Sequence, residues 1–194
     1  MKNSLLMRID TPYTLNFLIY LQNIYLNQKQ REEQFKFPYL TEMIRFYDDF
    51  EMKFKELWED ISIKLSEDDG NSIDLKIFND EKNLFYEKLF IPNSDSLKTY
   101  NEIFTGFKVW WSSYAGSFSV ERAIDNPSHN IYMELTNSLK INGREPKRQL
   151  NISLIYDKCL FSNTELYSYF AVLSMIDIYS NHKELVLKLQ SCIS

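Results

Sequence analysis

The chain has 194 residues and a formal net charge of −5 at pH 7, with 22 basic and 27 acidic side chains. This length suits one domain spanning 1–194 that buries its own core. The acidic balance and the lack of a basic block make nucleic acid an unfavourable partner. The two cysteines, Cys159 and Cys192, form no CxxC motif, so we expect no disulfide framework and no metal site in a cytoplasmic protein.

We expect no segment to cross a membrane. The longest apolar-rich stretch, YFAVLSMIDIY at 169–179, contains Asp177 and is shorter than the ~20 residues that a spanning helix needs. At the N terminus, Arg8 and Asp10 follow the apolar run LLM at once, so no secretion signal is expected. Aromatic residues make up 15% of the chain and glycine only four positions, which is typical of a packed, helix-rich protein.

The first two thirds of the chain predict about five helices. The segment 13–27 is apolar almost all round and follows Thr11 and Pro12, two helix-start signals, so we expect a buried helix there. Apolar residues then recur at steps of three and four over 39–66, which predicts one long amphipathic helix. The segment 73–78 suits a short strand or a helical turn.

Two further helices are expected over 80–90 and from about residue 97 to 115. The second of these carries five aromatic rings at spacings of three and four: Tyr100, Phe104, Phe107, Trp111 and Tyr114. Such spacing places the rings along one helix face, where they usually pack into a core.

The apolar period changes to two in the C-terminal third. Alternation over 131–141 and again over 150–156 lies on either side of the turn signal NGREPK. This pattern predicts an antiparallel β-hairpin with one face buried. An isolated hairpin is marginally stable, so helices must cover its apolar face.

Two capping boxes follow the expected hairpin. Ser162 with Glu165 predicts a helix over about 163–179, and Asn181 with Glu184 predicts a short terminal helix. The expected fold is therefore α+β: a mostly helical N-terminal two thirds packed with a C-terminal antiparallel hairpin or small sheet and one or two final helices.

The stretch VWWSSYAGSF at 109–118 supplies the candidate binding residues, which are Trp110, Trp111, Tyr114 and Gly116. The helical register favours a core position for Trp111, with Trp110 on its shoulder. Small residues beside large rings leave room for a ligand or a partner side chain, and Gly116 can end the helix with exposed backbone.

The stretch SVERAIDNPSHN at 119–130 supplies the candidate catalytic residues, which are Glu121, Arg122, Asp125 and His129. An acid, a base and a cation this close in sequence could form a site for acid/base chemistry or hold one metal ion. The same residues also suit a solvated surface turn between a short helix and the strand expected from residue 131.

The spacing of Arg122 and His129 resembles the R-x(4-6)-H pattern of the HEPN ribonucleases, helical proteins that cleave RNA without a metal. The match covers eight of the 194 residues, and Ala123 stands where that family usually has a polar residue. The resemblance implies that Arg122 and His129 would be the catalytic pair. In that family the histidine lies on a helix, whereas Pro127 and the alternation that follows predict otherwise here.

The sequence contains no P-loop, dinucleotide-binding, nucleophile-elbow, zinc-protease or calcium-loop motif, so no cofactor is expected. We therefore expect a non-enzymatic interaction or regulatory protein that binds another protein, because aromatic residues anchor interfaces. The alternatives are a metal-independent hydrolase or ribonuclease using Arg122 and His129, and a small-molecule-binding domain around Trp111. The helix at 39–66 could serve as a homodimer seam or pack within the chain.

Overall fold

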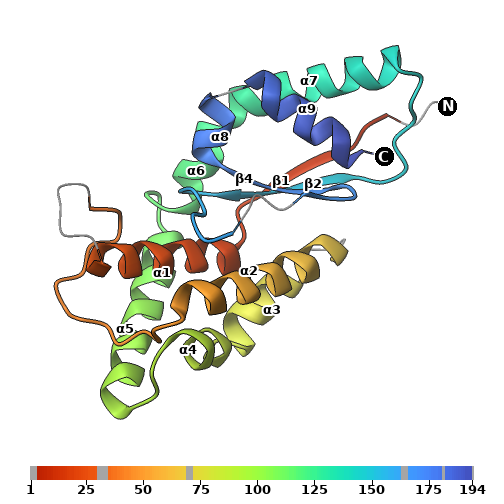
Figure 1. Cartoon of the computed structure of the whole chain (residues 1–194). Helices are drawn as coiled ribbons and strands as arrows, with labels where there is room; N and C mark the ends of the chain where they lie inside the picture. Colours follow the sequence, from red (N-terminus) through yellow and green to blue (C-terminus); the bar gives the residue numbers. More distant parts are fainter. Residues whose placement is uncertain (1–3, 30–34, 69–71, 163–165, 181, 194) are drawn as a thin grey trace.

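A computed structural model describes residues 4–29, 35–68, 72–162, 166–180 and 182–193. Within these ranges the fold is α+β, with nine helices and a small four-stranded sheet. Helices α1 to α5 lie on one side of the sheet and α7, α8 and α9 on the other (Figure 1). In the described part of the chain, no helix is long and apolar enough to cross a membrane.

Helix α1 is the centre of the helical layer, where it packs against α2, α3 and α5. It is apolar almost all round because neighbours cover it on all sides, and Phe17 in its second turn has five aromatic ring centroids within 6.3 Å. The five helices of this layer are α1 (Tyr13–Lys29), α2 (Phe50–Glu67), α3 (Ser72–Asp80), α4 (Asn83–Leu89) and α5 (Ser94–Trp111).

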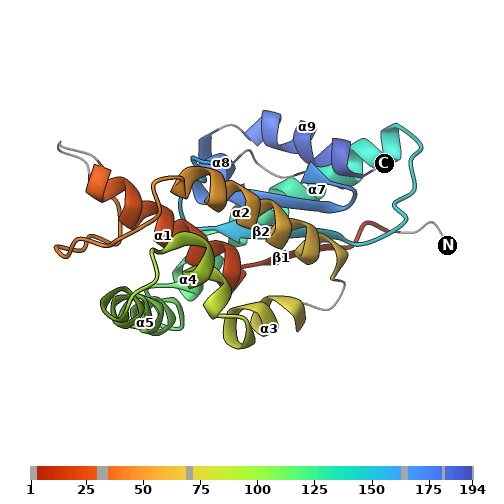
Figure 2. The ribbon, with the colours of Figure 1, turned by 60° about the horizontal axis from the view of Figure 1, so that its bottom comes forward.

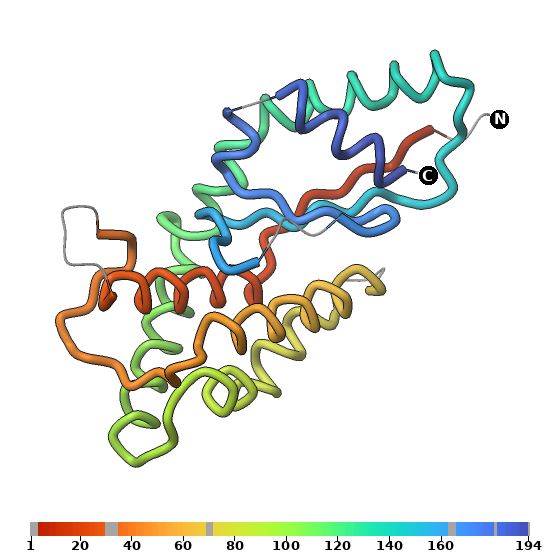
Figure 3. Tube along the Cα trace, in the orientation of Figure 1, coloured from red at the N-terminus to blue at the C-terminus, as the bar shows by residue number. Residues whose placement is uncertain are grey.

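The sheet joins both ends of the chain. Its strands are β1 (Met7–Asp10), β2 (Leu150–Ile155), β3 (Leu166–Tyr167) and β4 (Phe170–Ser174). Their order is β1-β2-β4-β3. The β1/β2 and β2/β4 pairs are parallel, while β3 and β4 are antiparallel. Figure 3 shows β1 and β2 side by side although about 140 residues separate them in the chain.

The second layer completes the burial of the sheet. It follows α6 (Ser117–Ala123) and consists of α7 (Asp125–Ile141), α8 (Met175–Ser180) and α9 (His182–Cys192). Helices α7 and α9 pack on one another. The strand residues Ile152 and Leu154 are buried and alternate with Ser153, so the two faces of β2 differ in polarity.

The hairpin predicted over 131–156 is wrong in its first half. Residues 131–141 belong to helix α7, whose buried residues Ile131, Leu135 and Leu139 are spaced by four. The alternate positions Met133 and Ile141 are 44% and 84% exposed. In an alternating pattern, every second apolar residue is four positions from the next, which is also the spacing of one helix face. Here that helix face packs into the core. The segment 150–156 does form a strand, β2, but between two parallel neighbours.

The helix predicted over 163–179 is also wrong, because 170–174 is strand β4 and a helix begins only at Met175. All five residues of β4 are buried. A short run that is apolar at every position occurs in central strands as well as in buried helices. Glu165 and Asn181, which carried the two capping predictions, lie outside the described residues.

The long helix predicted over 39–66 begins later, at Phe50. The segment before it pairs with the chain after α4 instead: Tyr47 N donates to Leu89 O, and Ile91 N donates to Arg45 O. This tertiary pairing replaces the helical hydrogen bonds that the periodicity suggested. The apolar face of α2 is buried within the chain, and 73–78 is helical, as part of α3.

Candidate functional site

The candidate site begins at the tight turn between α5 and α6. A Cβ atom on Gly116 would lie 2.6 Å from both Cα and the carbonyl oxygen of Trp111. Ser113 closes the same turn through its hydroxyl, which donates to Trp110 O over 2.6 Å. The small residues at 112–117 therefore let the chain fold back closely on the end of α5, and this sets the direction of α6.

The α5–α6 turn and helix α6 together present a row of exposed side chains. Tyr114 and Phe118 are 81% and 41% exposed, and their rings are perpendicular with centroids 5.1 Å apart. The guanidinium carbon of Arg122 lies 5.4 Å from the Phe118 ring centroid, within the range of a cation–π contact. Phe118 and Arg122 are four residues apart on α6 and so share one face of this helix, and Tyr114 joins them through its ring contact with Phe118.

Helix α8 extends this row with a second tyrosine. Tyr179 is 61% exposed, and its hydroxyl donates to the carbonyl oxygen of Ala123, at the end of α6. Arg122 and Tyr179 also line a shallow hollow of about 390 Å³ together with His182. We call Tyr114, Phe118, Arg122 and Tyr179 the aromatic strip.

An ion pair of Arg122 and a histidine–carboxylate contact lie at the strip. Arg122 Nη1 lies 3.0 Å from Asp125 Oδ2, and both side chains are more than 60% exposed. His182 Nε2 lies 2.9 Å from Glu134 Oε1. Exposed pairs contribute at most about 1 kcal/mol to stability, so these contacts mainly orient the guanidinium and the imidazole at the surface.

The two adjacent tryptophans are not part of this surface. Trp111 has no exposed area and stacks on Phe107 at 5.8 Å, so it cannot touch a ligand in this conformation. Trp110 is half-buried, 4.7 Å from the Phe37 ring and 5.1 Å from the Tyr156 ring. Of the four predicted binding residues, Tyr114 is the one on the aromatic strip, and Gly116 acts through the turn beneath it.

The structure does not bring the four predicted catalytic residues together at one point. Arg122 and Asp125 form an ion pair, whereas Glu121 accepts a hydrogen bond from Thr11 Oγ1 over 2.9 Å. His129 is exposed on α7, and among the described contacts none joins it to Arg122. Placing His129 ahead of a strand was wrong, because Pro127 lies in the first turn of α7, where a helix tolerates proline.

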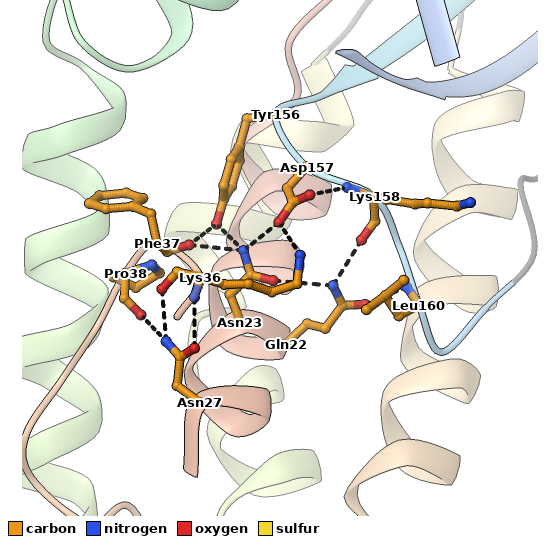
Figure 4. A network of polar contacts seen from close by, with 10 residues as sticks. All are labelled: Gln22, Asn23, Asn27, Lys36, Phe37, Pro38, Tyr156, Asp157, Lys158 and Leu160. Carbon is orange, nitrogen blue, oxygen red and sulfur yellow. Dashed lines mark hydrogen bonds and ion pairs between the residues drawn. The ribbon is translucent and has the colours of Figure 1, made fainter. Parts of the chain in front are cut away.

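A network of buried amides on α1 escaped the sequence analysis. Asn27 Nδ2 donates to Lys36 O and Pro38 O, both over 2.8 Å. Asn23 Nδ2 donates to Phe37 O over 2.8 Å and to Asp157 Oδ2 over 3.0 Å. Figure 4 shows these bonds tying the 36–38 segment to α1.

Gln22 binds the chain that leaves β2 in the same way. Its Nε2 donates to Lys158 O over 3.0 Å, and its Oε1 accepts from Leu160 N over 2.7 Å (Figure 4). These buried amides satisfy backbone groups of irregular chain, so we assign them a structural role. The sequence feature that could have revealed this network is the presence of amide side chains at residues 16, 22, 23 and 27 of an otherwise apolar helix.

The charged member of this network is Asp157. Burial alone would raise its pKa, but the hydrogen bond and charge of Lys36, 2.9 Å away, and bonds from Lys158 N and Asn23 outweigh burial and lower the pKa below the ordinary value. Burial raises the pKa of the neighbouring Tyr156 well above 10. Both groups therefore keep their ordinary charge states at neutral pH.

No family model matches the chain, and neither the curated proteins nor the solved structures include a significant match. The geometry of the aromatic strip is therefore the starting point for a functional proposal.

Proposed function

We propose that the protein binds another protein through the aromatic strip. The observation that carries the proposal is the contact of Phe118 with both Tyr114 and Arg122, beside Tyr179 in the hollow that it shares with Arg122. All four side chains are at least 40% exposed. Tyrosine and arginine are enriched among the residues that dominate binding energy at protein interfaces. Contiguous exposed apolar surface on a folded protein marks interaction sites.

The strip is also held in place before any partner arrives. The Gly116 turn sets the start of α6, and the Tyr179 hydroxyl bonds to the end of the same helix. A rigid aromatic surface loses little conformational entropy on association, which favours affinity. This argument makes the strip a better interface than an equally exposed but isolated side chain such as Met43.

The test is affinity capture from a lysate of the native source with the tagged full chain and its variants. The double change Tyr114→Ser with Phe118→Ser removes the ring of the α5–α6 turn and the ring of α6. We expect a stoichiometric protein partner with the unmodified chain and at least about tenfold lower recovery with this variant, since losing one anchor residue often costs about 2 kcal/mol or more.

Phe35→Ser with Tyr39→Ser is the matched control. These rings are 57% and 53% exposed and lie 4.5 Å apart, in the segment between α1 and α2. Recovery with this control should equal that of the unmodified chain. Equal loss with both variants, or recovery of no protein partner, would contradict the proposal. Far-ultraviolet circular dichroism establishes that each variant remains folded.

A further inference from the structure

A second feature, which shares no residue with the aromatic strip, is a cavity of about 350 Å³ between the sheet and helices α2, α3 and α6. Part of its lining comes from β1, α2 and α3, whose ribbons can be followed in Figure 2. Sites for small molecules begin at roughly 300 Å³. The cavity is therefore large enough for a metabolite-sized ligand.

Four carboxylates line the cavity in two groups. Asp10, at the end of β1, is next to Thr11, whose hydroxyl donates to Glu121 of α6. Asp68 and Asp74 come from the end of α2 and the start of α3. Among the described residues that line the cavity, none is basic. Low-dielectric walls concentrate the field of these charges inside the cavity.

The protein compensates these acids only in part. Asp74 Oδ2 and Oδ1 accept from the backbone nitrogens of Tyr13 and Thr14, over 2.8 and 3.0 Å, which caps the start of α1. Arg8 Nε lies 2.7 Å from Asp10 Oδ2. Burial, assisted by the charge of Asp10, raises the pKa of Asp74. Asp68 Oδ2 accepts from Ile73 N over 2.7 Å. These backbone donors carry no net charge, so among the contacts named here one arginine faces several carboxylates.

Ser153 is an independent sign of a ligand. It pairs with Asp10 in the sheet register and lines the cavity, yet it is only 7% exposed. Among the described residues no hydrogen bond reaches its hydroxyl, and the residue faces the cavity. Polar side chains that are mostly buried nearly always have a hydrogen-bond partner in the protein or in ordered water. An unpaired hydroxyl on an acidic cavity wall therefore points to a hydrogen-bond donor supplied from outside.

The chemistry of the walls selects the class of ligand. Within the described residues, no three acidic, histidine or cysteine side chains gather around one point as a metal ion requires. The carboxylates are instead distributed, with the apolar residues Leu65, Leu75 and Phe170 also lining the cavity. Distributed acids and apolar walls suit an organic cation with an aliphatic body.

We propose that this cavity binds a small aliphatic diamine. One ammonium group would lie near Asp10, Glu121 and the Ser153 hydroxyl. The other would lie near Asp68 and Asp74, with the carbon chain against the apolar wall. An ammonium group donates three hydrogen bonds and accepts none, which matches carboxylate and hydroxyl acceptors.

The first experiment is isothermal titration calorimetry of the full chain at low ionic strength. The probes are 1,4-diaminobutane, butylamine, 1,4-butanediol and magnesium chloride. We expect the diamine to bind roughly tenfold more tightly than butylamine, because it engages both acidic groups, and the diol and Mg²⁺ to give no binding. Absence of diamine binding, or equal binding of Mg²⁺ or the diol, would overturn the proposal.

Variants then locate the binding. Asp10→Asn with Glu121→Gln should weaken diamine binding roughly tenfold. The control, Glu59→Gln with Glu102→Gln, makes the same change in net charge on exposed parts of α2 and α5 and should leave binding unchanged. Unchanged binding in the cavity variant, or equal weakening in both, would place the diamine elsewhere and overturn the proposal.

Ser153→Val tests the site without altering its charge. It removes the hydroxyl and partly fills the cavity, so it should also weaken diamine binding, with folding checked by circular dichroism. Unchanged affinity in this variant would contradict the proposed position of the ammonium group. The variant with Tyr114 and Phe118 changed to serine should bind the diamine normally, so failure of the protein-binding proposal would be distinguishable.

Discussion

Gly116 is the residue on which the geometry of the α5–α6 turn depends. Replacement by alanine would place a methyl group against the backbone of Trp111, which cannot move aside as a flexible side chain can. We expect Gly116→Ala to lower the free energy of unfolding by about 3 kcal/mol, the size of an overpacking penalty. Urea denaturation followed by tryptophan fluorescence measures this change.

The control for that measurement is Gly106→Ala, in the same segment of chain. A Cβ there would meet only Tyr20 Oη, at an ordinary 3.8 Å, and the residue lies within helix α5. Alanine should raise the free energy of unfolding by up to ~1 kcal/mol through helix propensity. If both alanine variants changed the free energy of unfolding in the same direction, close approach to Trp111 would not be the reason that position 116 requires glycine.

Asp157 makes stability depend on pH. Its pKa is lowered in the folded protein, so its contribution is complete above the unfolded value of about 3.9 and is lost as the pH falls through the folded value. Lys36→Met removes the salt bridge, and we expect it to lower the free energy of unfolding at pH 7 by roughly 1 kcal/mol. The difference should shrink below about pH 4.

Thermal unfolding of both proteins across this pH range provides the measurement. Lys55→Met is the matched control, because Lys55 forms a longer, exposed contact with Glu59 at 3.7 Å. Its effect should be near zero at every pH, as for most exposed ion pairs. A constant Lys36→Met effect from pH 7 to the acid limit would mean that its role is packing and not the charge of Asp157.

Among the elements, α7 best shows how a periodic pattern can mislead. As a strand, 131–141 would bury Met133 and Leu135 on the same face. As helix α7, it buries Leu135 completely and leaves Met133 44% exposed. We expect Leu135→Ala to reduce the free energy of unfolding by ~2–5 kcal/mol and Met133→Ala by less than about 1 kcal/mol. Chemical denaturation distinguishes the two, and equal losses would favour the strand.

The aromatic strip is likewise an arrangement of elements. Tyr114 and Arg122 stood out in the sequence, but Tyr179 lies 56 residues beyond Ala123, its hydrogen-bond partner. No local pattern links α6 to α8, because the contact exists only once both helices pack against the rest of the chain. Sequence reasoning could therefore identify half of this surface.

At the scale of the whole molecule, an amide of α1 joins the helical layer to the sheet. Asn16, which is fully buried, donates to Leu154 O over 2.9 Å and accepts from Tyr156 N over 2.9 Å. The helical layer thereby satisfies backbone groups of the central strand region. We infer that neither layer retains its structure without the other, and that unfolding is a single cooperative transition.

This prediction can be checked with one reporter in each layer. The three tryptophans, at positions 58, 110 and 111, lie in α2 and α5, while the buried Cys192 lies in α9. In a Cys159→Ser variant, urea unfolding followed by fluorescence and by labelling of Cys192 should give the same midpoint. Two separated midpoints would show two independent units instead of one domain.

Local periodicity in the sequence determined the α+β class, the buried α1 and the core position of Trp111, because each depends on which face of one element is apolar. The tertiary structure alone decided between strand and helix at 131–141 and 170–174, because the apolar residues of both segments fit the spacing of a strand and that of a helix. It also decided the juxtaposition of Asp10 with Ser153 and of Arg122 with Tyr179. Those pairs come from distant segments, and only packing of the whole chain brings their side chains together.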